Sequence, residues 1–527
     1  MAASPEAVFA QGAAALEAGD FRAAERLFQQ ILASDPRAHP AWNALSVVAV
    51  RAGLPEIAVE HSRRALELDR RNPVYLNNLG VACGELGEYA RAEEALRRAL
   101  KAKPAYAEGH FNLGKVLHKL GRLGDALRAY ERAYAIEPQF PGIRAALIHM
   151  YRKHGRADRA LAVLKEAPGG LENDEFVPLS VEVLAELEGI ARATAWLKGL
   201  MARHPDWHGA RFTLAQLLLA QGHWREGWRE YLWRPNVLNE RVDVATRATS
   251  VPAVLPKLLE GKRARLRSEQ GMGDNLFFLR FAEELRGRGA SVDVLVPPKL
   301  AAVLPAAGPL RVLREDDPAV AALAWDHDLW IGDLPGLLES EAVPPAFPLV
   351  RDEARAARWR QRLAGLGPPP YLALTWRAGI DVLRNREFGN PRSFLSKEIP
   401  AAVLGAALRG WRGTLVSVQR DPLPGETQAA AAAAGAPLHD LSALNDELPE
   451  ILAMLSVVEE YVCVSNTNVH LLAGIGRTAR VLVPYPAEWR WMREGSSPWF
   501  PGFPMYREPQ ARGWEAPLLD LRKDLFP

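Results

Sequence analysis

The sequence predicts two parts: a superhelix of paired α-helices, then an α/β module of two doubly wound, Rossmann-like parallel sheets. A 34-residue period in the first half predicts the superhelix, and strand-like apolar runs that alternate with amphipathic helices predict the sheets. The expected boundaries are 1–234 for the helical array, 235–262 for a linker, and 263–350 and 351–527 for the two halves of the module. A chain of 527 residues is also too long for a single core.

The 34-residue step links the glycines Gly19, Gly53, Gly87, Gly121 and Gly155, and several alanines follow the same step. That length, and segments such as YLNNLGVACGELGEYARAEEALRRALKAKP, resemble the tetratricopeptide repeat. Each glycine is expected to end the first helix of a hairpin, because glycine accepts a left-handed backbone. Stacked hairpins bury their apolar faces against each other and leave a concave groove. We expect about seven repeats, the last one reaching residue 234.

The groove of such an array usually holds a peptide or protein segment. Asn43, Asn77, Asn78 and Asn112 recur at one helical position, and their amides could hold the backbone of a protein acceptor through paired hydrogen bonds. They could equally cap or solvate the groove. Both interpretations stay open at this point.

Composition excludes several classes of protein. The 65 basic and 63 acidic residues give a net charge of +2, without the basic excess of a nucleic-acid binder. Cys83 and Cys463 lie in different halves, so they form neither a disulfide framework nor a metal cluster. The first residues lack the basic flank of a signal peptide, and no apolar run approaches the ~20 residues of a membrane helix. We expect a cytoplasmic protein without a membrane span.

Strands and helices alternate in the second part, which indicates parallel sheets. The expected strands are 264–269, 291–296, 310–313, 328–332, 371–376, 414–419, 461–465 and 480–484, and helical patterns cover 275–288, 399–409 and 447–458. Proline-rich stretches at 343–348 and 365–370 divide the strands into two groups. Ligands of open parallel sheets bind beyond the carboxyl ends of the strands, so the loops after strands are the candidate sites.

The first such loop is 268–281. Gly271 and Gly273 permit a tight turn that a ligand can approach closely, and Asp274 stands at the start of the next helix. Its carboxylate could act as a general base in the cleft between the sheets, or simply cap the helix.

The second loop is 464–477, where Ser465, Asn466, Thr467 and Asn468 separate a strand from a helix. Backbone N–H groups at a helix N-terminus, together with hydroxyl and amide donors, suit the diphosphate of a nucleotide. An ordinary capping cluster explains the same residues equally well. His470 is either a phosphate donor or a structural residue of the helix.

The third region combines 375–379 and 417–422. Arg377 and Arg420 could bind phosphate oxygens, since guanidinium groups pair well with phosphate. A nearby segment adds further positive charge through Arg384, Arg386, Arg392 and Lys397. The predicted donor-binding set also includes Gln270 and Gln419.

Several ordered motifs carry a family resemblance: EQGMGD at 269–274, the K-x-I-P of 397–400, the S-x-Q of 417–419, SNTNVHLLAGIGR and the W-R-W…S-P-W tail of 484–508. Together they resemble bacterial tetratricopeptide proteins with a heptosyltransferase-like glycosyltransferase domain. The two-part architecture is also similar to that of O-linked N-acetylglucosamine transferases and bacterial flagellin glycosyltransferases.

This resemblance implies a GT-B module that uses a nucleotide sugar and needs neither a metal nor another cofactor. It implies Asp274 as the base, and Asn466, Thr467, Asn468 and His470 as ligands of the donor diphosphate. The sequence departs from the family pattern in two places: Asn466 replaces the usual aspartate, and the histidine comes one residue early. Asp326-His327-Asp328 matches the D-x-D metal motif of another glycosyltransferase fold, but it leads into a predicted strand and is interpreted as coincidence.

The predicted function is therefore inverting transfer of a sugar to a hydroxyl acceptor. The acceptor would be a Ser or Thr of a protein held by the repeats, with flagellin as one candidate by analogy of architecture. Two alternatives remain. One is a non-catalytic interaction scaffold with a degenerate GT-B module, which Asn466 favours and Asp274 disfavours. The other is a transferase that acts on lipid or polysaccharide. Trp489, Trp491 and Trp499 are expected to build the core of the module.

Overall fold

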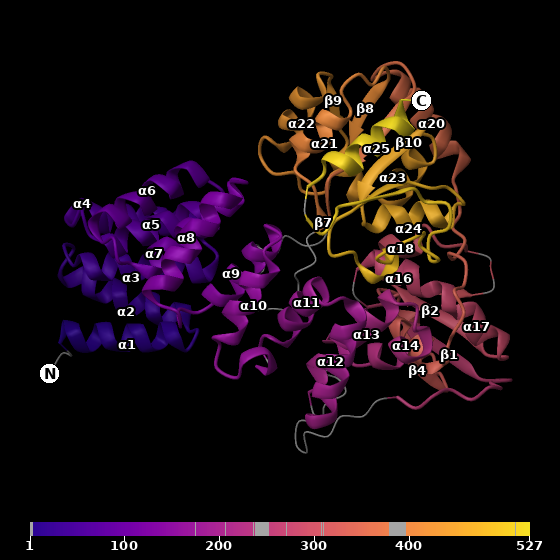
Figure 1. The fold of residues 1–527 in the computed structure, drawn as a ribbon, viewed down its shortest axis with the longest axis horizontal. Helices are drawn as coiled ribbons and strands as arrows, with labels where there is room; N and C mark the ends of the chain where they lie inside the picture. Colours follow the sequence, from indigo (N-terminus) through magenta and orange to yellow (C-terminus); the bar gives the residue numbers. More distant parts are fainter. Residues whose placement is uncertain are drawn as a thin grey trace. The chain divides into compact units, whose positions relative to one another are not determined.

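The computed structural model describes residues 4–526, apart from 174, 206, 236, 238–251, 270, 307, 309, 379–396 and 512. The chain forms two compact units, Met1–Leu179 and Ser180–Pro527 (Figure 1). Each unit is considered by itself below. No described helix combines the length and the apolar character needed to cross a membrane.

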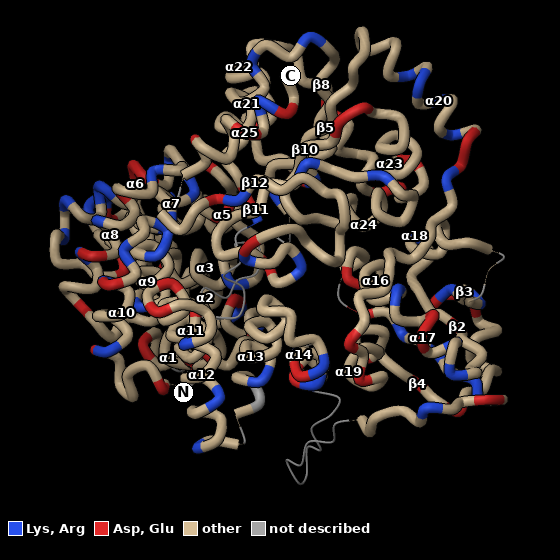
Figure 2. Tube along the Cα trace, turned by 45° about the vertical axis from the view of Figure 1, so that its right-hand side comes forward, with Lys and Arg blue, Asp and Glu red and all other residues tan. Residues whose placement is uncertain are grey.

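The first unit is a stack of helical hairpins. Its helices are α1 (Pro5–Glu17), α2 (Phe21–Ser34), α3 (His39–Ala52), α4 (Pro55–Leu68), α5 (Pro73–Glu85), α6 (Tyr89–Ala102), α7 (Ala107–Lys119), α8 (Leu123–Ile136), α9 (Ile143–Lys153) and α10 (Ala157–Lys165). From α1 to α10, each helix packs on the next one along the chain. Basic and acidic residues are interspersed over this unit, in keeping with the small net charge of the chain (Figure 2).

The repeat prediction is confirmed down to its glycines. Gly19, Gly53, Gly87, Gly121 and Gly155 all have φ between 66° and 80°, the left-handed conformation that ends the first helix of each hairpin. Close packing explains the small residues within the helices. A Cβ atom on Gly80 would lie only 2.6 Å from Leu96 Cγ of the paired helix.

The second unit opens with helices as well. α11 (Val177–Leu187) crosses the boundary, and α12 (Ile190–Arg203), α13 (His208–Ala220) and α14 (Trp224–Tyr231) follow. α13 and α14 form one more hairpin around Gly222, whose φ is 80°. This hairpin is part of the unit that also holds the sheets.

α14 packs directly on the α/β module. The fully buried Trp228 makes edge-on ring contacts with Phe278, Phe281, Trp489 and Trp499 at centroid distances of 5.3 to 6.1 Å. These contacts place the aromatic side chains of the last hairpin in the largest hydrophobic cluster of the unit.

The first sheet has four parallel strands in the order β3-β2-β1-β4. They are β1 (Arg263–Arg267), β2 (Ser291–Val296), β3 (Arg311–Arg314) and β4 (His327–Trp330), and the accompanying helices are α16 (Met272–Phe278), α17 (Ala282–Gly287), α18 (Pro298–Ala301) and α19 (Leu334–Leu337). β2 and β3 are added in turn on one side of β1, and β4 pairs with the other side of β1.

The second sheet has six parallel strands in the order β12-β11-β10-β5-β8-β9. They are β5 (Tyr371–Thr375), β8 (Thr414–Ser417), β9 (Leu438–Asp440), β10 (Glu460–Val464), β11 (Arg480–Val483) and β12 (Met505–Arg507), and their helices are α20 (Glu353–Ala364), α21 (Ala401–Ala407), α22 (Glu426–Ala434), α23 (Leu448–Leu455), α24 (Thr467–Gly474) and α25 (Glu515–Leu525). Numbered along the chain, this order reads 6-5-4-1-2-3, the Rossmann arrangement with its switch point between β5 and β10. The predicted parallel sheets are confirmed, and each of the eight expected strands is present.

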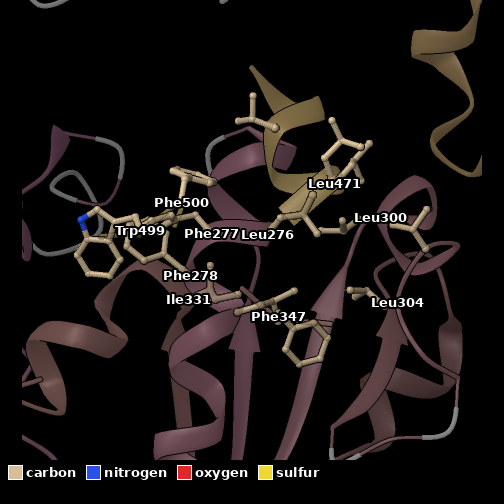
Figure 3. Packing of buried hydrophobic residues seen from close by; sticks show 14 of the residues in the cluster. Leu276, Phe277, Phe278, Leu300, Leu304, Ile331, Phe347, Leu471, Trp499 and Phe500 are labelled. Carbon is tan, nitrogen blue, oxygen red and sulfur yellow. The ribbon is translucent and has the colours of Figure 1, made fainter. Parts of the chain in front are cut away.

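One hydrophobic cluster runs through both sheets. Leu276, Phe277 and Phe278 of α16 pack near Leu471 of α24 and Phe500 of the C-terminal tail (Figure 3). Trp489, Trp491 and Trp499 are buried in the same cluster, as the sequence predicts. The shared core fixes the carboxyl end of the first sheet against that of the second.

Replacing Trp228 by alanine should destabilise the second unit by about 3–5 kcal/mol, because it leaves a cavity among four aromatic rings. Trp207→Ala is the matched control, since Trp207 is partly exposed and, among the described residues, stacks on His204 alone. Thermal unfolding of the full chain followed by tryptophan fluorescence measures both. Equal losses in the two variants would show that α14 is not part of this core.

Candidate functional site

A cavity of about 440 Å³ lies where the loops after β1, β5, β8 and β10 meet. This is the switch point of the second sheet, the place where open parallel sheets bind ligands. The volume falls within the range of small-molecule sites. The lining residues are Gly271, Met272, Gly273, Asp274, Thr375, Arg377, Ala378, Lys397, Val418, Gln419, Arg420, Asp421, Leu423, Asn445, Leu448, Ile451, Ser465, Asn466, Thr467, Asn468, His470 and Arg490.

The structure brings the predicted site residues of the second half together. Asp274 lines the cavity, and so do the described members of the predicted donor-binding set: Gly271, Gly273, Arg377, Lys397, Gln419, Arg420, Ser465, Asn466, Thr467, Asn468 and His470. Gln270 lies outside the described residues, as do Arg384, Arg386 and Arg392.

Gly273 allows the N-termini of α16 and α24 to approach each other. A Cβ atom on this glycine would lie 3.2 Å from His470 Cδ2 and 3.4 Å from Thr467 Cα. Asn466 caps α24, with its Oδ1 accepting the Asn468 backbone N–H at 2.8 Å. Asn466 is therefore a capping residue, and the first turn of α24 begins at the cavity. Binding of a diphosphate by the same loop stays a prediction.

Beneath this loop lies a hydroxyl that the sequence interpretation missed. Asn466 and Asn468 both donate to Tyr461 Oη, at 2.9 and 3.1 Å, and Thr375 Oγ1 lies 2.8 Å from the same oxygen. Burial raises the pKa of Tyr461 well above its ordinary value, so it stays neutral. Its side chain links the end of β5 to the loop after β10. Tyr461 is the first residue of the predicted strand 461–465, so its position in the sequence did not indicate this role.

Gln419 links two strand ends. Its Oε1 accepts the backbone N–H groups of Trp376 and Arg377 at 3.0 and 2.9 Å, and its Nε2 donates to the carbonyls of Arg377 and Arg420 at 3.0 and 2.8 Å. All four of these hydrogen bonds join the Gln419 amide to backbone atoms. Gln419 thus shapes the wall of the cavity rather than presenting a free amide to a ligand.

The arginines differ in how far they are engaged. Arg377 donates to the Asp421 carbonyl at 2.9 Å and to Glu426 at 3.2 Å. Arg420 is exposed at the cavity, and its guanidinium has no hydrogen-bond partner among the described residues. Asp421 has a φ of 45°, an uncommon backbone conformation that turns the chain away after β8. Arg420 is the cation best placed to gain a ligand.

A chain of alternating charges crosses the cavity wall. Lys397 pairs with Glu488 at 2.8 Å, Glu488 pairs with Arg490, and Arg490 pairs with Asp274 at 2.6 Å. Burial would raise the pKa of Glu488, but Lys397 and Arg490 outweigh it and hold that pKa well below its ordinary value. The sequence interpretation missed Glu488 and Arg490. Their signal was two charged residues next to the tryptophans of the W-R-W motif.

His470 is buried beside Phe277 and Phe500, and its Nδ1 has no partner within the described structure. Burial, followed by the neighbouring charges of Arg490 and Arg280, lowers its pKa well below the ordinary value. The imidazole is therefore neutral near pH 7 and contributes no positive charge to the cavity.

In the first unit, the four predicted acceptor-binding asparagines bond to one another across repeats. Asn78 donates to Asn43 at 2.8 Å, and Asn112 donates to Asn77 at 3.0 Å. Asn77 is buried and also donates to Glu108 at 3.1 Å. These bonds tie successive repeats together, and acceptor binding by the same residues stays a prediction.

The D-x-D sequence lies at an ion-paired surface. Asp326 accepts from Lys262 and from the Arg263 backbone, and Asp328 pairs with Arg265 and Arg267. Among the residues that the structure describes, no three His, Cys, Asp or Glu side chains gather as metal ligands would.

Comparison with known proteins identifies the repeats. Tetratricopeptide repeat models match residues 9–73, 77–142 and 117–175. Protein FlbA of Caulobacter vibrioides is 26% identical over 332 residues, which cover 58% of this chain and 53% of that protein. The chain thus spans about half the length of this curated relative.

Two solved structures show the extent of the structural likeness. A thermophilic tetratricopeptide repeat protein of Thermus thermophilus is 26% identical, with a TM-score of 0.31, and the match covers 35% of this chain and 99% of that one. PilF of Pseudomonas aeruginosa is 23% identical, with a TM-score of 0.33, over 38% of this chain and 92% of that one. The chain carries tetratricopeptide repeats, an architecture suited to protein–protein interaction, followed by a region of parallel sheets and helices.

Gln419→Ala should lower the stability of the second unit, because it leaves two backbone N–H groups unpaired at about 1–3 kcal/mol each. The neighbouring Arg420→Ala should leave the thermal melting curve unchanged, since no described residue depends on its guanidinium. Differential scanning calorimetry of both variants measures this contrast. A stable Gln419→Ala protein would mean that its amide is not the link between β5 and β8.

Proposed function

We propose that the α/β module is a GT-B glycosyltransferase. It transfers a sugar from a nucleotide-activated donor to a hydroxyl group of a protein acceptor, which the repeats hold. The observation that carries this proposal is the cavity at the switch point of the second sheet, where a helix N-terminus and arginines face a carboxylate from the first sheet. This combination suits an anionic donor and an acceptor that must lose a proton.

Two walls of the cavity suit the two parts of a nucleotide donor, the diphosphate and the nucleoside. The N-terminus of α24, with Arg377, Arg420 and Lys397 nearby, provides the N–H groups and positive charge that bind a diphosphate. Val418, Leu423, Leu448 and Ile451 add an apolar wall that suits the nucleoside.

The reaction would proceed as a single displacement. Asp274 accepts the proton of the acceptor hydroxyl, the hydroxyl oxygen forms a bond to the anomeric carbon, and the bond from that carbon to the diphosphate oxygen breaks. The nucleoside diphosphate leaves with the bonding electrons, and the α24 N-terminus and the arginines stabilise its charge. Attack from the side opposite the leaving group inverts the anomeric centre. The protein's own cations supply this stabilisation, so the proposed mechanism includes no metal or further cofactor.

A non-catalytic scaffold is the second candidate, and Asn466 is the observation that favours it. The repeats would then be the functional part, and the cavity would be a remnant. Flagellin as the acceptor rests on analogy of architecture alone. A lipid or polysaccharide acceptor would leave the repeats to recruit partners only.

A nucleotide sugar or nucleoside diphosphate should raise the melting temperature of the full chain. Ligand at 100 times its dissociation constant adds about 2.7 kcal/mol to the folded state. The panel is UDP, GDP, ADP, dTDP and CMP with their sugar conjugates, and Arg420→Ala should weaken the effect of the ligand that binds. The full chain is needed, because a fragment that starts at residue 236 lacks the buried Trp228 and Arg234. If no compound moves the transition, the donor site is wrongly assigned.

Asp274→Asn should lower the rate of sugar transfer by about 10²–10⁴-fold, because general-base catalysis typically contributes that factor. Donor affinity and melting temperature should stay unchanged. Asp316→Asn is the control, since Asp316 also pairs with an arginine at 2.6 Å but lies exposed beyond β3. Transfer by Asp274→Asn at the full rate would remove Asp274 from the role of base. Lost folding would give it a structural role through its pair with Arg490, since the N-cap of α16 is Gly271.

A further inference from the structure

Arg490 is held rigidly by its surroundings. It lies in the short helical turn η6 (Trp489–Trp491), and both flanking tryptophans are buried. The Trp491 ring stacks on Phe500, with centroids 4.5 Å apart and planes inclined by 18°. Ser497 Oγ donates to the Arg490 carbonyl at 2.6 Å. The backbone of this arginine is therefore held independently of the contacts that its side chain makes.

The guanidinium is fixed as well. It lies 4.6 Å from the ring centroids of both Phe277 and Trp489, and it donates through Nη1 to Glu488. The other oxygen of Glu488 accepts from Lys397 at 2.8 Å and from Ser465 at 3.0 Å. Lys397 and Ser465 thus hold Glu488, and Glu488 in turn binds Arg490 through a contact that does not involve Asp274.

Arg490 uses its remaining terminal nitrogen on Asp274. Nη2 donates to Asp274 Oδ1 at 2.6 Å, while Oδ2 has no hydrogen-bond partner in the described part of the chain. The Asp274 side chain is 28% exposed and lines the cavity. One oxygen of this cavity-lining carboxylate is therefore bound by a fixed cation, and the other has no such partner among the described residues. A base oriented by a third group has this arrangement.

We propose that Arg490, held by Glu488, is the positioning residue that orients Asp274 for proton transfer. This inference rests on the proposed function. Arg490 is buried, so little water competes for the carboxylate, and the bond is made before the substrate arrives. In the W-R-W motif, the two tryptophans then fix the backbone turn, and the arginine orients the base.

The test is a double-mutant cycle in the full chain, with hydrolysis of the nucleotide sugar that binds best as the reaction and water as the acceptor. The released nucleoside diphosphate is measured in single turnovers, and donor affinity is measured by thermal shift. Arg490→Gln should lower the rate by about 10- to 100-fold, because a misplaced catalytic group costs up to about 10²-fold, with donor affinity unchanged. Arg490→Lys should restore part of the rate.

In the cycle, Arg490→Gln should cost nothing further once Asp274 is Asn, because Arg490 acts through Asp274. Arg314→Gln, which breaks the exposed 2.6 Å pair with Asp316, is the control and should leave the rate unchanged. Three outcomes would overturn the inference. The first is that the two substitutions lower the rate independently, so that the double variant loses the product of the two single losses. The second is a weaker donor affinity at full rate, and the third is a melting temperature that falls equally in the Gln and Lys variants. If the wild-type chain binds no nucleotide sugar, the proposed function fails with it. If the wild type binds and hydrolyses its donor but the cycle is multiplicative, only the role of Arg490 fails.

Discussion

The close approach of α16 to α24 is the constraint on which the second unit depends. It requires a residue without a side chain at Gly273, because a Cβ atom there would press on His470 and Thr467. The approach carries Phe277 into the core shared by both sheets, and it sets Asp274 beside the loop that begins α24. Packing and site geometry thus follow from one contact. A larger residue at 273 would move the proposed base away from the donor loop and open the core at the same time.

A second constraint joins the last helical hairpin to the site. Arg234, just after α14, is fully buried between Glu269 and Asp333, and its Nη1 donates to Asp333 at 2.6 Å. Burial would lower its pKa, but the two carboxylates outweigh it and raise that pKa. Removing one partner of such a buried set typically costs about 3–5 kcal/mol. Glu269 lies just after β1 and next to the Gly271–Asp274 turn, so the end of the hairpin forms part of the support of the cavity.

Sequence periodicity predicted what depends on local pattern. Left-handed glycines at Gly53 or Gly87 and the strands before each loop follow from spacing and hydrophobicity, and parallel topology then brings the loop residues together. The periodicity could not predict hydrogen-bond and ion-pair partners that come together only when distant segments pack. Arg490 meets Asp274 from 216 residues away, and Gln419 bonds to backbone 42 residues earlier. The spacing gave the position of Asn77 in its repeat, but it did not show that its amide would bond to Asn112 and Glu108 of the next repeat.

The departure at Asn466 can be weighed in the same physical terms. Its Oδ1 caps α24 as an aspartate would, so the helix start is preserved. Its Nδ2 adds a bond that a carboxylate cannot make, a donation to Tyr461 Oη, and the hydroxyl proton of Tyr461 can then be donated to Thr375. The amide also carries no negative charge at the helix end where the diphosphate would bind. Asparagine here keeps the cap and reduces repulsion of an anionic donor, so the departure from the family pattern is also compatible with an enzyme.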